Sequence, residues 1–265
     1  MKWASVYYSN FTKGDVEKKL NVRICNLIKA SKPIQDLRGE AKYDVSDTKE
    51  KVYTRLVEYL HCEPYPSMAE DDFQESNLHD MVKAVLLPTL SDFKHKSKCD
   101  DGLTLHQAKE ILWVDPGFED FIFMNFISST EESEDEDRTF VLVVEAKQSL
   151  LAAAFRQLLL ALNDMWDSNG KKGVVYGFAV AGEDWHMVTY DGKFRLTDKF
   201  TVMFPSMGEG EMKEKWMREY SVVVDLLYIA LEAGGCRKLG GLLNANASSF
   251  SAKHNFLFAK DFRPE

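Results

Sequence analysis

Two charged side chains with possible catalytic chemistry end an otherwise apolar segment. Residues 139–147 read TFVLVVEAK, so Glu145 and Lys147 follow a run typical of a buried strand. Side chains alternate between the two faces of a strand. One face is predicted to carry Val141, Val143, Glu145 and Lys147, and the other Leu142, Val144 and Ala146. A carboxylate and an ammonium group in such a strand require partners, such as each other, a metal ion or hydrogen-bonding neighbours.

Asp120 is a candidate partner for these two residues. It lies near the start of the preceding predicted strand, where pairing with residues 139–147 would bring it close to Glu145. Two carboxylates at a sheet edge suit Mg²⁺, which takes oxygen ligands and is commonly bound by one or two carboxylates plus substrate phosphate. A lysine beside them could orient a metal-bound water or stabilise negative charge on a phosphate under attack. The alternative for Asp120 is a strand-entry residue next to the Asp115-Pro116-Gly117 turn.

The spacing of Asp120 and Glu145-Ala146-Lys147 resembles the D…(D/E)-x-K signature of the PD-(D/E)XK nuclease superfamily, which has the restriction-endonuclease-like fold. The resemblance covers roughly residues 70–205. Within it, residues 176–196 look like the strand pair of a subgroup that includes fungal and oomycete Crinkler-type effectors and transposon-associated proteins. The resemblance implies a metal-dependent nuclease that uses Mg²⁺ or Mn²⁺ to hydrolyse phosphodiester bonds of nucleic acid, with DNA favoured over RNA.

The resemblance also implies a role for individual residues. Asp120, Glu145 and the backbone carbonyl of Ala146 would bind the metal ion, and Lys147 would be the catalytic lysine. Gln157 resembles the glutamine that several subgroups place on the helix after this strand. Its alternative is a polar group satisfied by the backbone.

A third acidic residue, Glu75, and two departures complete the comparison with the family pattern. Glu75 resembles an extra acidic metal ligand of some members, although a first-turn carboxylate favoured by the helix dipole is the more common role of such a residue. Glu119 replaces the proline of the signature, and Ala161 stands where a tyrosine often follows the core-helix glutamine. His79 and His186 are interpreted as half-buried structural residues.

The elements that must position these residues follow from hydrophobic periodicity and turn signals. Helical periodicity occupies residues 15–30, 49–60, 77–90, 149–166 and 213–233. Strands are predicted at residues 108–114, 118–126, 139–147, 173–181, 185–190 and 200–204, with KFRL before the last of them. The strands at 173–181 and 185–190 are predicted to pair through the connection Gly182-Glu183-Asp184. The first two strands flank Asp115-Pro116-Gly117 and are predicted to form a hairpin.

This order predicts an α/β protein with a restriction-endonuclease-like core, in which helices flank a mixed β-sheet, and a helical N-terminal extension. We expect residues 1–69 to form the extension, residues 70–205 the nuclease-like core, and residues 206–265 a C-terminal helix followed by an irregular tail. The N-terminal third could also bind a protein partner.

Composition limits the class of protein and its partners. The chain has 265 residues, 45% of them hydrophobic, as in globular proteins. It lacks both a transmembrane-length apolar run and a secretory signal, so an intracellular protein without a membrane association is expected. The net charge of −9 and the absence of an obvious basic patch favour a second hypothesis, a catalytically silent nuclease-fold protein that acts as a binding or scaffold module.

Overall fold

The computed structural model describes residues 10–34, 41–63, 65–66, 75–98, 103–107, 121–127, 137–147 and 151–234. The helices are α1 (Lys13–Leu20), α2 (Ile24–Lys29), α3 (Ser46–Cys62), α4 (Glu75–Ser97), α5 (Leu151–Ser168), α6 (Met212–Glu219) and α7 (Val222–Gly234). The strands are β1 (Leu103–Gln107), β2 (Phe121–Ile127), β3 (Asp137–Ala146), β4 (Val175–Ala181), β5 (Asp184–Tyr190), β6 (Phe194–Leu196) and β7 (Phe200–Thr201). No helix in the described part of the chain is both long enough and apolar enough to cross a lipid bilayer.

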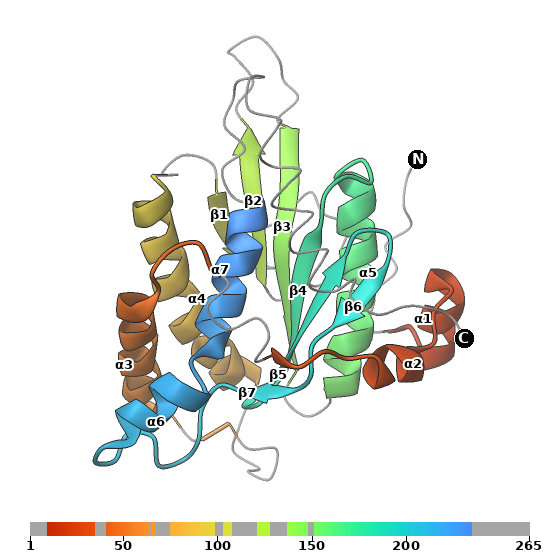
Figure 1. Ribbon diagram of the computed structural model, residues 1–265. Coiled ribbons are helices and arrows are strands. Elements are labelled where there is room, and N and C mark those ends of the chain that lie inside the picture. The colour runs from red at the N-terminus through yellow and green to blue at the C-terminus, as the bar shows by residue number, and fades with distance from the viewer. Residues whose placement is uncertain are drawn as a thin grey trace.

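The described strands form one mixed sheet in the order β1-β2-β3-β4-β5-β6, with β7 paired to β5 (Figure 1). β1, β2 and β3 form an antiparallel meander. β3 and β4 are parallel, and α5 makes the crossover between them, as a parallel connection requires. β5 and β6 then continue the sheet in antiparallel fashion. The prediction of an α/β fold with a mixed sheet flanked by helices is confirmed.

On one side β2 pairs with β1, a strand that was not predicted from the sequence. The predicted strand at residues 108–114 lies outside the described residues, whereas β1 occupies Leu103–Gln107. Its residues pair antiparallel with β2 from Leu103 opposite Asn125 to Gln107 opposite Phe121. LTLHQ contains three polar residues among its five, so it lacks the continuous apolar run that predicts a buried strand.

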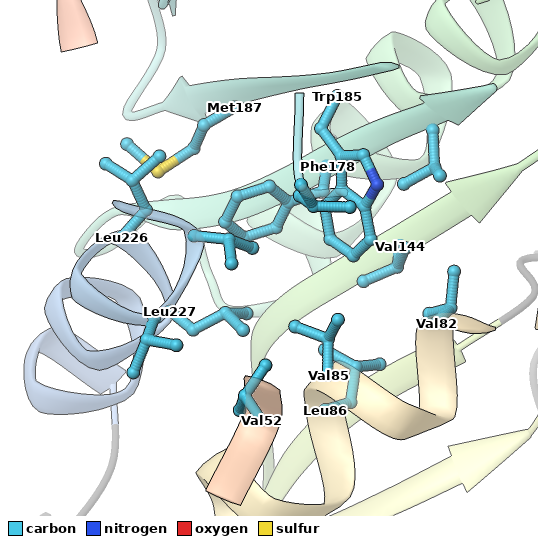
Figure 2. Close-up of a cluster of buried hydrophobic side chains, with 14 of the residues drawn as sticks. Val52, Val82, Val85, Leu86, Val144, Phe178, Trp185, Met187, Leu226 and Leu227 are labelled. Carbon is cyan, nitrogen blue, oxygen red and sulfur yellow. The ribbon is translucent and has the colours of Figure 1, made fainter. Parts of the chain in front are cut away.

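Helices cover both faces of the sheet, and each face has its own hydrophobic core. On one face, α5 packs on β3 and β4, and the apolar residues of α1 and α2 join its core. On the other face, side chains of α3, α4 and α7 converge on the strands, and Figure 2 shows Val52, Leu86 and Leu227 among them around Val144 and Phe178. We call these the α5 face and the α7 face. α3, which lies within the predicted N-terminal extension, therefore shares a hydrophobic core with the sheet. The boundary predicted between this extension and the core at residue 69 stays a prediction.

Two of the predicted helices are broken into pairs. The periodic segment 15–30 forms α1 and α2, because Asn21 ends α1 in the left-handed conformation with φ 51°. Asparagine tolerates this conformation better than most residues, so it can act as a helix stop in place of glycine. The segment 213–233 likewise forms α6 and α7, and the break falls at Tyr220 and Ser221.

A β-bulge in β3 changes which side chains share a face. Phe123 pairs with Leu142 but Met124 pairs with Phe140, so Val141 is an extra residue in the ladder. Val141 lies in the core of the α7 face, and the α-carbon of Gly234 approaches it so closely that an added Cβ would lie 2.3 Å from its Cγ1. The prediction that Val141 shares a face with Val143 is therefore wrong, because strict alternation fails at a bulge.

A buried polar cluster links the three helices of the α7 face. Asp92 of α4 accepts hydrogen bonds from Thr48 and from Tyr228, the latter at 2.6 Å, and its oxygens lie 3.0 Å from Lys51 Nζ and 2.7 Å from Lys96 Nζ. Burial opposes ionisation, but the hydrogen bonds from Lys96, Thr48, Tyr228 and Lys51 outweigh it and hold the pKa of Asp92 well below its usual range. We call these five residues the Asp92 cluster.

Candidate functional site

Glu145 and Lys147 lie together at the carboxyl end of β3, the strand flanked by antiparallel β2 and parallel β4. Lys147 Nζ is 3.8 Å from Glu145 Oε2. The Glu145 side chain is completely buried, whereas 19% of the Lys147 side chain is exposed. The site is therefore a partly desolvated charge pair that opens to solvent on its lysine side.

The strand register explains why the two side chains meet. Beyond the bulge, alternation is regular: Val144 and Ala146 lie in the core of the α7 face, and Val143 lies in the core of the α5 face. Glu145 and Lys147 therefore project on the α5 face with Val143. β3 ends at Ala146, but the backbone N–H of Lys147 still donates a hydrogen bond to the carbonyl of Val180 in β4 at 2.9 Å. The backbone at Lys147 therefore continues the direction of β3.

Gln157 lies on the helix that covers this face. It is buried with 8% exposure and shares the sheet-facing stripe of α5 with Ala154, Leu158 and Ala161. α5 approaches the sheet closely at Gly177, where an added Cβ would lie 2.4 Å from Leu158 Cδ1. The sequence-predicted Gln157 is thus on the same side of the sheet as Glu145 and Lys147.

The structure does not describe the other two acidic candidates completely. Asp120 lies outside the described residues, although its chain neighbour Phe121 pairs with Val144, one position before Glu145. Glu75 is the first residue of α4, a helix that packs on the α7 face, and its side chain is outside the described residues. Both assignments stay predictions.

The oxygen atoms that the described site residues offer as ligands are of the type that a hard cation binds. Glu145 offers carboxylate oxygens and Ala146 a backbone carbonyl, the ligand types that Mg²⁺ binds, and neither a thiol nor an imidazole is among the residues assigned to the site. Within the described ranges no three His, Cys, Asp or Glu side chains are grouped to hold a metal ion. The further ligand predicted for this site, Asp120, lies outside the described residues.

The two histidines have structural surroundings. His186 is half-buried, and its Nδ1 lies 3.1 Å from the carbonyl oxygen of Thr197, an acceptor that requires the proton to be on Nδ1. Burial lowers the pKa of His186 from its ordinary value. His79 is also half-buried and packs edge-on against Phe121, with ring centroids 5.5 Å apart. The half-buried environment predicted for both residues is confirmed.

Sequence reasoning missed the buried carboxylates of the α7 face. Asp92 is 7% exposed and Asp225 is 1% exposed, and Asp225 Oδ2 lies 2.7 Å from Lys49 Nζ. A signal was present for Asp225, because it is the single charged residue within VVVDLLYIA, residues 222–230. Both carboxylates form interhelical contacts on the face opposite Glu145, so they belong to the scaffold.

Comparison of the chain with known proteins finds no matching family model, no matching curated protein and no matching solved structure.

Proposed function

We propose that the protein is a metal-dependent nuclease of the PD-(D/E)XK type with a restriction-endonuclease-like core. The observation that carries the proposal is the placement of Glu145 and Lys147 side by side on one face at the end of β3. The order of elements supports it: helix α4, the antiparallel meander β1-β2-β3, the crossover helix α5 and the parallel strand β4 follow the pattern that the signature implies.

Each residue has a defined task in this proposal. Glu145 and the carbonyl of Ala146 would bind Mg²⁺ or Mn²⁺, with Asp120 as the further ligand. When bound, the cation would polarise the scissile phosphate and lower the pKa of a water molecule. Lys147, held 3.8 Å from Glu145, would place a positive charge where negative charge develops on the phosphate. Gln157 would orient the site from α5.

One observation favours a second candidate, a catalytically silent protein that binds a partner through the same fold. Glu145 is completely buried beside Lys147, and a buried ion pair can serve a structural purpose alone. In this case Lys147 would neutralise Glu145 permanently, and the site would not take up a cation. The net charge of −9 agrees with this candidate.

The two candidates are separated by a plasmid-nicking assay with Mg²⁺, Mn²⁺ or EDTA. Metal-dependent nicking that Glu145→Gln and Lys147→Met each reduce by about 100-fold or more would support the nuclease. Lys199→Met is the matched control, since Lys199 also pairs with a carboxylate of the sheet, Asp184, at 2.7 Å. Circular dichroism must show that all variants fold. Nicking that survives both site substitutions would refute the proposal.

Calorimetry with Mn²⁺ tests the silent candidate independently of activity. Folded wild-type protein that takes up no Mn²⁺ at millimolar concentration would support the silent candidate. Binding that Glu145→Gln abolishes and Lys199→Met leaves intact would support the metal site.

A further inference from the structure

The N-terminal helices form a basic patch that is not obvious from the sequence, and its charge is opposite to that of the rest of the chain. Residues 13–32 contain six lysines and arginines and two acidic residues, for a net charge of +4. Because the whole chain has a net charge of −9, the remainder carries −13. We call the six cations the α1–α2 basic surface: Lys13, Lys18, Lys19, Arg23, Lys29 and Lys32.

Packing of α1 and α2 leaves five of these six cations exposed, and Lys32 is half-buried. Val16 of α1 and Ile24 of α2 are buried in the core of the α5 face, so the opposite sides of both helices face solvent. The Arg23 side chain is 74% exposed and that of Lys13 is 58% exposed. Lys18 and Lys29 are also exposed, and neither forms an ion pair with any residue that the structure describes. Lys13 and Arg23 pair with Glu17 at 4.0 and 3.4 Å, and Lys19 lies 3.9 Å from Asp164 of α5. Lys18 and Lys29 are therefore the exposed cations of the basic surface that are available to an anionic partner.

The basic surface lies on the same face of the sheet as Glu145. Its last cation, Lys32, lies close to the row of paired residues that crosses the strands from Glu145. Glu145 pairs with Ala179 of β4, and Ala179 pairs with His186 of β5. Beside His186, the N–H of Thr197 donates to the carbonyl of Met187, and Thr197 forms a parallel bridge with Lys32. Strands are spaced by about 4.8 Å, so a row that crosses from β3 to the Lys32 segment is on the order of 20 Å long.

That distance suits a nucleic acid lying across the α5 face. Duplex DNA carries one phosphate charge per roughly 1.7 Å of its axis with both strands counted, so about 20 Å of duplex carries on the order of ten charges, of which only a part faces the protein. We propose that the α1–α2 basic surface binds the phosphate backbone of the nucleic acid whose scissile bond reaches Glu145 and Lys147, an inference that rests on the proposed function.

An anionic membrane fits the surface less well. A helix that lies in a membrane interface inserts an apolar face between the lipids. In α1 and α2 the apolar side chains Val16, Leu20, Ile24 and Leu27 are packed against the protein. Among the described residues of these two helices, Ile28, 53% exposed, is the large apolar side chain that remains for such insertion.

The test measures binding without cleavage. Fluorescence anisotropy of a labelled DNA duplex is recorded in EDTA between about 50 and 200 mM salt. The test variant is Lys18→Gln/Lys29→Gln. The matched control is Lys94→Gln/Lys98→Gln, which removes the same charge from the last turn of α4 and the residue that follows it, on the α7 side of the sheet.

We expect the test variant to bind the duplex on the order of tenfold or more weakly at about 0.1 M salt, and the salt slope to fall by about one per lost phosphate contact. The control should stay within about twofold of wild type. Wild-type protein that does not bind the duplex, or a test variant that binds as the control does, would overturn the inference. Tighter binding to phosphatidylserine vesicles than to the duplex would also overturn it and identify a membrane partner.

The outcomes separate this inference from the proposed function. In one outcome, duplex binding depends on salt and is weakened only by the α1–α2 substitutions, but the wild-type protein does not nick DNA with any metal ion. This outcome would support the nucleic-acid-binding surface and refute the proposed nuclease activity. Nicking that depends on Glu145 and Lys147, with binding unchanged by the α1–α2 substitutions, would retain the nuclease and refute this surface.

Discussion

Substitution of Asp92 by asparagine should destabilise the protein more than any surface charge change, because Asp92 joins three helices. Its oxygens accept from Thr48 of α3 and Tyr228 of α7 and pair with Lys96 of its own helix. The Asp92 side chain is 7% exposed, so solvent screens these contacts only weakly. Asparagine preserves the shape of the side chain but removes the negative charge with which the hydroxyl and ammonium donors of the Asp92 cluster interact.

The magnitude follows from the number and burial of these contacts. A hydrogen bond to a charged group contributes roughly 1.5–3 kcal/mol, and loss of one partner of a buried pair costs about 3–5 kcal/mol. Lys51, with 59% of its side chain exposed, contributes little since its ammonium group can be solvated instead. Because the asparagine oxygen still accepts one hydrogen bond, we expect Asp92→Asn to lower the free energy of unfolding by about 2–4 kcal/mol at neutral pH.

The assay is urea denaturation followed by circular dichroism as a function of pH. The pKa of Asp92 is depressed in the folded protein, so its stabilisation is complete above the unfolded carboxyl pKa of about 3.9 and is lost as pH falls through the folded value. The difference between wild type and Asp92→Asn should therefore be constant at neutral pH and should narrow once pH falls below about 4.

Asp80→Asn is the matched control. Asp80 lies on the same helix and pairs with Lys83 at 3.2 Å, but 57% of its side chain is exposed. We expect this variant to lose less than about 0.5 kcal/mol. If Asp92→Asn were no more destabilising than Asp80→Asn, or if its deficit persisted unchanged under acid conditions, the structural reasoning would be refuted.

Two further predictions concern the α5 face. Gly177→Ala should lower the free energy of unfolding by about 1–3 kcal/mol, because the new Cβ would lie 2.4 Å from Leu158 Cδ1 and 3.2 Å from Leu162 Cδ2, so these buried side chains or α5 itself would have to shift. Its control is Gly14→Ala in α1, where the nearest atom is 3.8 Å from the new Cβ, and chemical denaturation should show that this substitution is neutral or stabilising. The pKa of His186 should lie below the ordinary histidine value, because burial disfavours the cationic form of its side chain. An NMR pH titration would measure it, with His186→Gln used to assign the signal. A midpoint at or above about 6.5 would contradict the described burial.

Local pattern was sufficient for the elements that carry the site. The apolar run before Glu145 predicted β3, the nearly all-apolar segment after it predicted the buried helix α5, and the Gly182-Glu183 connection predicted the hairpin of β4 and β5. The reason is that burial on two faces demands continuous apolar sequence, and a tight turn demands glycine or a polar residue.

Other features depended on contacts between distant segments. A bulge moved Val141 to the α7 face, and its position reflects pairing with β2 and contact with Gly234 of α7. The burial of Asp92 required Thr48 and Tyr228 from two other helices. No sequence window contains these partners together, so periodicity could not reveal them.

By itself, the sequence determined the alternation that places Glu145 and Lys147 on one side of β3, because side-chain direction in a strand is a local property. Only the tertiary structure decided which side that is. The α5 face receives both residues, Gln157 and the basic helices α1 and α2, while α3, α4 and α7 cover the opposite face. The physical reason is that the choice of face depends on which helices bury which surface of the sheet, and that burial is shared among segments far apart in the chain.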